Sequence, residues 1–139
     1  MALLERTFRW TERYSVNIAV LDRQHRALFD TVNGLKDALS SGHGSAVVDE
    51  VLKQLFDYAL THFATEELLM TEHAFPGLET HRAEHKRFAR DIQKFLDDYK
   101  AGKTGVPVEL MFYLQSWLQE HLLGADKAYS AYLNARGVR

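Results

Sequence analysis

The chain has 139 residues, 46% of them hydrophobic, with a formal net charge of −2. This length suits one domain with a substantial core, and the nearly neutral charge gives no reason to expect a nucleic-acid partner. The chain has no cysteine, which excludes disulfides and thiolate metal sites, and it shows no signal peptide and no apolar run of about 18 residues, so we expect a cytoplasmic protein without a membrane span.

Residues 1–20 predict an N-terminal arm that packs on the rest of the domain. Their apolar side chains recur at near-even spacing, which suits an extended segment along a core: Trp10, Tyr14, Val16, Ile18 and Val20. From Leu21 to Leu39, apolar residues recur every three to four positions, as in an amphipathic helix. Asp22 is a candidate cap for this helix, with a start a few residues earlier as the alternative.

Three further apolar stripes with helical spacing follow, over residues 48–73, 81–99 and 111–133. Pro76 separates the first two of these, and a glycine-containing link precedes Pro107, which suits the first turn of a helix. Residues 21–139 therefore predict a single all-α domain, an up-down-up-down antiparallel four-helix bundle.

Polar residues occupy six core-facing positions of these stripes: His25, His62, Glu66, His81, His85 and His121. Burying such groups without partners costs on the order of 2 kcal/mol or more each. Together they would consume most of the roughly 5–15 kcal/mol by which a domain is stable. They must therefore satisfy one another or a ligand that they share.

The chain topology allows these residues to meet. In antiparallel neighbouring helices, residues at the same height are equidistant from the link between the helices. The midpoints of His25 with His62, of Glu66 with His81 and of His85 with His121 all fall in or at the edge of the links. One layer of the bundle therefore collects all six. His73 lies eleven residues beyond His62, roughly 16 Å along the helix, and is too distant to join them.

Asp126 is a seventh candidate. It follows His121 by five residues, about 140° around an α-helix, so we do not expect it directly beneath that histidine. A carboxylate that spans two metal ions need not share the direction of a terminal ligand. We interpret Gly124, two residues earlier, as making room beside the cluster.

The predicted donor set, five imidazoles and two carboxylates, discriminates among metals. A structural zinc ion takes four ligands, and calcium and magnesium prefer oxygen. Imidazole with carboxylate suits iron, manganese or copper, and seven ligands indicate two ions. Ferritin-like di-iron bundles fit poorly, because they use Glu-x-x-His pairs and more carboxylates.

Several motifs in this order carry a resemblance to a known family. They are LDRQH at 21–25, HFATEE at 62–67, HRAEH at 81–85, WLQEH at 117–121 and DKAY at 126–129. With them the chain resembles the hemerythrin family, and within it the single-domain bacteriohemerythrins, from about Trp10 to Leu133.

The resemblance implies a non-haem di-iron site that binds dioxygen reversibly, with an oxo or hydroxo bridge. By motif position, one iron would be held by His81, His85 and His121, the other by His25 and His62, and the bridges would be Glu66 and Asp126. Two six-coordinate irons would then keep one open position, on the iron with two histidines.

Residues spaced to line an oxygen pocket are Leu28, Phe29, Phe63, Trp117 and Leu118, and Leu114 could line an access route. For Leu114, Trp117 and Leu118, plain core packing is the alternative.

Two functions remain open. The first is oxygen carriage, storage or delivery, or sensing, by a monomer with dioxygen as ligand and an oxygen-consuming enzyme as a candidate partner. The second is a di-iron enzyme (an oxidase, or a peroxide or nitric oxide detoxifier) or an iron-handling protein. Tyr58 and Tyr129 fall within about one turn of ligand positions, but the sequence shows no further acid or base near the open position, which favours oxygen binding without enzyme activity.

Overall fold

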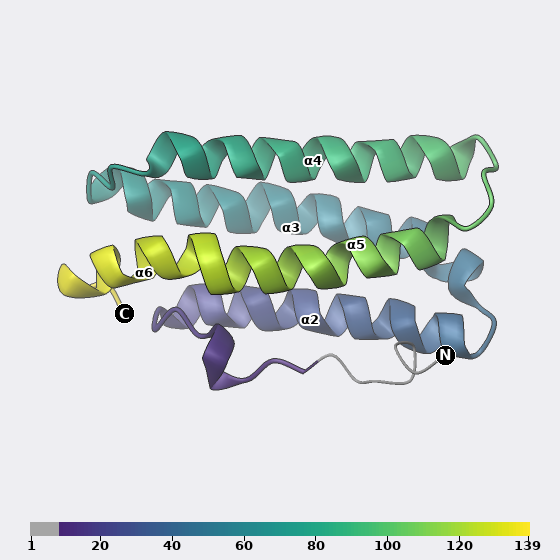
Figure 1. Ribbon diagram of the computed structural model, residues 1–139, viewed down its shortest axis with the longest axis horizontal. Coiled ribbons are helices and arrows are strands. Elements are labelled where there is room, and N and C mark those ends of the chain that lie inside the picture. Colours follow the sequence, from purple (N-terminus) through teal and green to yellow (C-terminus); the bar gives the residue numbers. More distant parts are fainter. Residues whose placement is uncertain (1–8) are drawn as a thin grey trace.

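The computed structural model describes residues 9–139, and its long elements are four antiparallel rods packed side by side (Figure 1). The elements are η1 (Glu12–Tyr14), α2 (Ala19–Ser40), α3 (Gly44–Glu72), α4 (Leu78–Lys100), α5 (Val106–Glu120), η2 (His121–Ala125) and α6 (Asp126–Ala135). The last three run on as the fourth rod, in which η2 is a single π-helical turn. The predicted all-α, antiparallel four-helix bundle is confirmed.

Each rod buries one side, as its apolar spacing predicts. On α4, for example, His81, His85, Phe88 and Ile92 are buried at intervals of three or four residues, while the residues between them are charged, apart from two alanines. Gly105 precedes α5 with φ +82°, a left-handed conformation that favours glycine, and Pro107 lies in the first turn of α5. The predicted breaks therefore separate the helices.

The segment before α2 differs in detail from the expected arm. Residues 1–8 of the predicted arm lie outside the described part of the chain, and Glu12–Tyr14 form a short 3₁₀ turn. Helix α2 begins at Ala19, so Val20 is helical and 37% exposed, not part of an extended arm. Asp22 does not cap α2: its carboxylate accepts hydrogen bonds from the Ser15 hydroxyl (2.6 Å) and the Val16 amide (2.9 Å). It ties the preceding segment to the bundle.

The apolar core consists of two clusters separated along the bundle. The larger cluster extends towards the α2–α3 and α4–α5 links and includes Leu28, Leu55, Phe88 and Leu118. The smaller one lies towards the opposite end and consists of Val16, Ile18, Leu21, Met70, Tyr129 and Leu133. Buried polar residues separate the two clusters along the chain: His25 lies between Leu21 and Leu28 on α2, Glu66 between Phe63 and Met70 on α3, and Asp126 between Leu122 and Tyr129 on the fourth rod.

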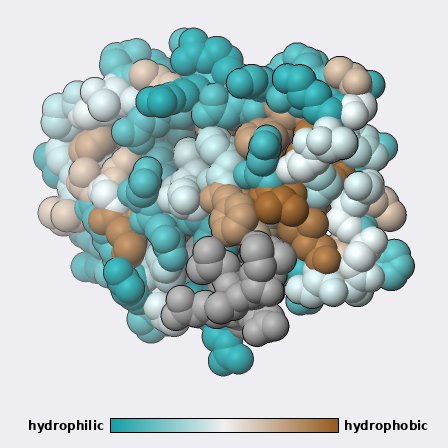
Figure 2. All heavy atoms as spheres, turned by 45° about the vertical axis from the view of Figure 1, so that its right-hand side comes forward, coloured by the Kyte–Doolittle hydropathy of each residue, from teal (hydrophilic) through white to brown (hydrophobic). Residues whose placement is uncertain are grey.

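The outer faces of the helices are polar. Hydrophilic side chains cover most of the face shown in Figure 2, and the large hydrophobic residues found exposed in the described part are Val20, Leu60 and Leu68. None of the described helices combines the length and the apolar character needed to cross a membrane.

Two leucines of α3 test the division between core and surface. Leu55 is fully buried and Leu60 is 75% exposed. We expect Leu55→Ala to lower the free energy of unfolding by about 2–5 kcal/mol, because it leaves a cavity. Leu60→Ala should change it by no more than about 0.5 kcal/mol. Urea denaturation of chelator-treated protein measures both, and equal losses would contradict this assignment of the core.

Candidate metal centre

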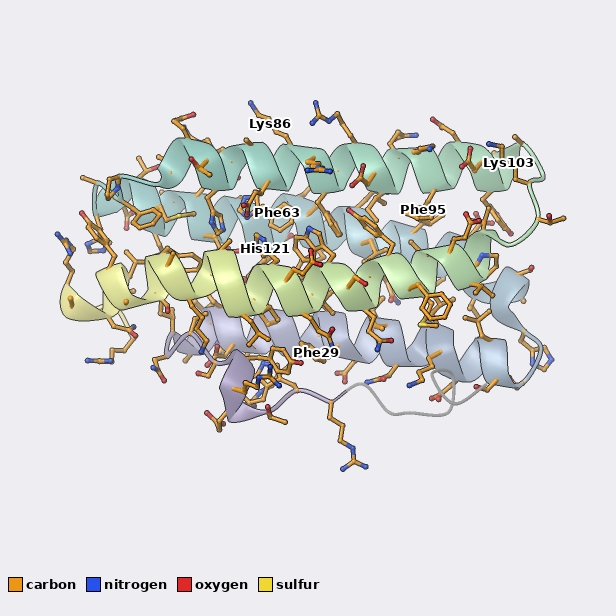
Figure 3. All side chains as sticks on the ribbon, viewed as in Figure 1. Phe29, Phe63, Lys86, Phe95, Lys103 and His121 are labelled. Atoms are coloured by element: carbon orange, nitrogen blue, oxygen red, sulfur yellow. The ribbon has the colours of Figure 1, made fainter. Side chains whose placement is uncertain are left out.

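Seven buried polar side chains meet in the middle of the bundle. His25 comes from α2, His62 and Glu66 from α3, His81 and His85 from α4, and His121 and Asp126 from the first residues of η2 and α6. None is more than 6% exposed. Figure 3 labels His121 and Phe63, which lie in the interior between the helices, whereas Lys86 extends outward from α4. The layer anticipated from the midpoints is present.

The side chains form two groups that could each hold a metal ion. One consists of Glu66, His81, His85 and His121, and the other of His25, His62 and Glu66. In each group the potential ligand atoms lie within 4.8 Å of one another. Glu66 belongs to both groups, so its carboxylate lies between three histidines on one side and two on the other.

Asp126 also contacts histidines of both groups. Its Oδ2 lies 3.2 Å from His25 Nε2, and its Oδ1 lies 3.3 Å from His81 Nε2 and 3.0 Å from His121 Nε2. Glu66 behaves similarly: its Oε2 is 3.4 Å from His81 Nε2, while its Oε1 contacts His62 Nε2. Each carboxylate is thus shared between the two groups.

The π-helical turn explains why Asp126 lies closer to His121 than α-helical geometry allows. A π turn closes its hydrogen bonds five residues apart, so residues i and i+5 come to the same side of the helix. The turn His121–Ala125 therefore places Asp126 beneath His121, and the expected angular offset between them is wrong. A Cβ atom added at Gly124 would meet nothing within 4 Å, so that glycine is not required to make room.

The unpaired atoms of this cluster fit metal ions. All five histidine Nε2 atoms and all four oxygens of Glu66 and Asp126 are buried, and none has a hydrogen-bond partner within residues 9–139. They lie close together without the alignment that hydrogen bonds need. Buried polar atoms left without partners are costly, and nine in one place call for a shared ligand. Imidazole nitrogens and carboxylate oxygens together are the donors of iron-type sites.

The electrostatics of the metal-free cluster keep both carboxylates ionised. Burial and the charge of Asp126 act to raise the pKa of Glu66, but the contacts with His62 and His81 outweigh them and hold it well below its usual range. Burial likewise acts to raise the pKa of Asp126, and contacts with His121, His25 and His81 lower it instead. Two ionised carboxylates therefore face the five imidazoles.

The histidines divide into two kinds. Burial acts to lower the pKa of His81, but its contacts with Asp126 and Glu66 raise it to about 9. Burial also opposes protonation of His121, whereas Asp126 and Glu84 raise its pKa to about 10. For His62 and His85, burial prevails and the pKa falls below its ordinary value.

Three of the histidines have outer partners at Nδ1, which sequence reasoning did not identify. His62 Nδ1 donates to Gln24 Oε1 (2.5 Å), and His85 Nδ1 donates to Glu67 Oε2 (3.0 Å). His121 Nδ1 lies 3.3 Å from Glu84 Oε2. These contacts leave the Nε2 atoms directed into the cluster. Each partner directly adjoins a core-facing polar position in the sequence, which is the only signal that could have indicated it.

Aromatic rings cover several of the histidines. Phe63 stacks on His85 with ring centroids 3.8 Å apart, Trp117 stacks on His121 at 4.4 Å, and Tyr58 stacks on His62 at 4.7 Å. The other predicted pocket residues, Leu28, Phe29, Leu114 and Leu118, are buried in the larger apolar cluster. Leu122 belongs to the same cluster, directly after His121, and was not predicted.

Two surface cavities reach the cluster. A groove of about 790 Å³ between α2 and α3 is lined by Gln24, Leu28, Tyr58 and His62, among others. A smaller cavity of about 360 Å³ between α4 and α5 adjoins His121, Glu84 and Trp117. Leu114 lines neither of them, so its role in an access route stays a prediction.

His73, the histidine predicted to lie outside the cluster, follows the end of α3 as its C-cap residue. Its backbone carbonyl accepts a hydrogen bond from the Tyr132 hydroxyl (2.6 Å). It belongs to neither group of potential ligands.

Comparisons with known proteins point to one family. The family described as the hemerythrin HHE cation binding domain matches residues 16–133. A bacteriohemerythrin of Stenotrophomonas maltophilia is 33% identical over 126 residues, covering 91% of this chain and 81% of its own. One from Methylococcus capsulatus is 32% identical, covering 91% and 96%. A crystal structure of a hemerythrin mutant superimposes with a TM-score of 0.81 at 28% identity, covering 91% and 96%.

The pKa shifts predict how the stability of the metal-free protein depends on pH. His81 and His121 stabilise the fold fully below their ordinary pKa of 6.5, and this contribution is lost as the pH rises through about 9 and 10. His62 and His85, with lowered pKa values, destabilise the fold as the pH falls below 6.5. We expect a stability maximum near pH 6.5, measured by urea denaturation with a chelator present.

Asp126→Asn provides the control for this pH dependence. Because Asp126 helps to raise the pKa of both His81 and His121, its neutral variant should flatten the decline above pH 6.5. Stability that continues to rise between pH 6.5 and about 9 in the unsubstituted protein would contradict the assignment.

Proposed function

The chain belongs to the hemerythrin family, and from this premise we propose that it binds dioxygen reversibly at a buried non-haem di-iron centre. One observation carries the proposal: two buried carboxylates, Glu66 and Asp126, each contact histidines of both groups. Two metal positions that share two carboxylates account for all nine unpartnered atoms of the cluster.

The residue groups suggest how the ligands divide. His81, His85 and His121 would hold one iron, and His25 and His62 the other. Glu66 and Asp126 would bridge the two irons, with an oxo or hydroxo group as the third bridge. The position with only two histidines then keeps one place free for an added ligand. When bound in the ferrous state, the two irons would supply two electrons and this open position to dioxygen.

The remaining residues of the site orient the ligands and exclude water. The Nδ1 contacts with Gln24, Glu67 and Glu84 fix the direction of three imidazoles. Leu28, three residues after His25 in α2, belongs to the larger apolar cluster with Phe29 and Leu118, and it lines the groove that reaches His62. Apolar side chains such as these favour reversible binding, because they hold no acid that would deliver protons to the ligand.

A di-iron enzyme, such as an oxidase or a peroxide or nitric oxide detoxifier, is the second candidate, and two hydroxyl groups favour it. Tyr58 and Tyr129 both bury their hydroxyls without a hydrogen-bond partner in residues 9–139. Tyr58 stacks on His62, and the ring of Tyr129 lies 5.1 Å from that of His81. A hydroxyl this close to the cluster is a potential proton donor, the group that an enzyme requires.

The physiological role that we infer is oxygen carriage, storage or delivery, with sensing as a variant. The protein would act as a monomer, and an oxygen-consuming enzyme is the partner that this role suggests.

Anaerobic reduction followed by exposure to air tests the proposal. We expect two irons per chain, measured by metal analysis. We also expect a coloured oxygen adduct that bleaches on degassing, measured by visible absorption. Decay of the adduct within seconds, with release of peroxide or turnover of a reductant, would instead identify the enzyme. A chain that binds a single zinc ion and no iron would exclude both functions.

The iron content of single-histidine variants distinguishes the histidines that bind iron from those that do not. His81→Ala should lose iron, because it removes a nitrogen that contacts both carboxylates. His73→Ala, the matched control near the end of the same helical hairpin, should keep both irons, because the contact of His73 with Tyr132 uses its backbone. Iron analysis after anaerobic reconstitution measures both, and full iron content in His81→Ala would refute the ligand assignment.

A further inference from the structure

The outer partners of the histidines differ in charge between the two groups. In the three-histidine group, His85 Nδ1 donates to the carboxylate of Glu67, and His121 Nδ1 lies 3.3 Å from Glu84 Oε2, a charge contact that lacks the alignment of a hydrogen bond. In the two-histidine group, His62 Nδ1 donates to the neutral amide oxygen of Gln24. His25 Nδ1 is buried and has no hydrogen-bond partner within the described residues. Two anionic partners therefore lie behind one metal position, and the single partner found behind the other is neutral.

Charge at Nδ1 changes how strongly Nε2 binds a metal. A carboxylate that accepts the Nδ1–H bond, or whose charge lies next to it, polarises the imidazole and raises its basicity, which strengthens its bond to a cation. A neutral amide polarises the ring less, because hydrogen bonds to ionised acceptors are about twice as strong. Loss of an outer partner typically changes metal affinity by about 10–100-fold. The difference between Glu67 or Glu84 and Gln24 is therefore large enough to measure.

The surrounding contacts preserve the negative charge behind His85. Arg82 Nε binds Glu67 Oε1 at 3.0 Å, which leaves Oε2 for His85. Arg82 is itself shared, because its NH1 donates to Glu79 at 2.7 Å. One guanidinium between two carboxylates leaves a net charge of about one negative unit, so Arg82 positions Glu67 without cancelling its effect.

The neutral partner is equally well held. The side-chain amide nitrogen of Gln24 lies 3.5 Å from Thr65 Oγ1, and that hydroxyl donates to the Thr61 carbonyl at 2.8 Å. The Gln24 amide oxygen is thereby directed towards His62. Gln24 also lines the groove between α2 and α3, where a charged side chain of the same size could reach water. Glutamine at this position is therefore not imposed by lack of space for a carboxylate.

We propose that Glu67 and Glu84 make the three-histidine position the tighter metal site, and that Gln24 keeps the two-histidine position weaker. Metal ions would then fill the site in order, first beside His81, His85 and His121 and then beside His25 and His62. This inference rests on the proposed two-metal site. It assigns Gln24, Glu67 and Glu84 as positioning residues that act through the histidines, which the family resemblance by itself does not assign.

Stepwise titration of the full metal-free chain with Co²⁺ tests the proposal without using dioxygen. Chelator competition and the visible bands of Co²⁺ give two dissociation constants. Glu67→Gln and Glu84→Gln should each weaken the tighter step by about 10–100-fold, and Gln24→Glu should strengthen the weaker step by a similar factor. His25→Ala, which removes a ligand from the two-histidine position, should abolish the weaker step and retain the tighter one.

Asp98→Asn is the matched control. It removes a carboxylate of α4 that pairs with Lys103 and contacts neither Arg82 nor a histidine of the cluster, so both constants should stay unchanged. Thermal unfolding of each metal-free variant checks the fold, and Gln24→Glu tests the inference by a gain in affinity, which a damaged fold would not produce.

The outcomes separate the inference from the function on which it rests. Binding of two Co²⁺ ions with constants that Glu67→Gln, Glu84→Gln and Gln24→Glu leave unshifted, or shift equally at both steps, would overturn the inference alone. Binding of fewer than two Co²⁺ ions by the unsubstituted chain would overturn the proposed di-iron centre, and the inference with it.

Discussion

The mutual contact of five imidazoles and two carboxylates in one buried layer is the constraint on which the rest of the structure depends. The layer interrupts the apolar core, so the bundle buries its hydrophobic side chains in two clusters, one on each side. Nine donor atoms in the layer have no hydrogen-bond partner in the described part of the chain. Such a layer costs stability unless a cation binds there. In this layer the bundle therefore gives up apolar core packing and has a potential cation site instead.

The backbone adapts to this layer at one place. A regular α-helix would direct His121 and Asp126 to different sides of the fourth rod. The single π turn at His121–Ala125 brings both side chains to the same side, and α6 then continues to bury Tyr129 and Leu133. π turns often occur at functional sites because they re-aim one side chain without breaking the helix. Here the re-aimed side chain is the carboxylate that contacts both groups of histidines.

A second regularity links neighbouring rods. Gln24 of α2 holds His62 of α3, Glu67 of α3 holds His85 of α4, and Glu84 of α4 adjoins His121 at the end of α5. Each partner is next to a core-facing polar residue in the sequence, so it lies at the edge of the buried face, where it reaches the next rod. Two adjacent residues of one rod thus have different roles: one lies in the buried layer, and the other contacts the Nδ1 atom of a histidine on the next rod.

The sequence by itself determined the helical bundle, its links and six of the seven polar residues of the layer, because hydrophobic periodicity and equal distances from the links depend only on spacing along the chain. It did not determine the start of α2, the role of Asp22, the π turn or the partners at Nδ1. Those features depend on angles and contacts between rods, which spacing does not encode. Asp22 illustrates the difference: as a predicted cap it suited the sequence, but tertiary packing gave it the Ser15 hydroxyl and the Val16 amide instead.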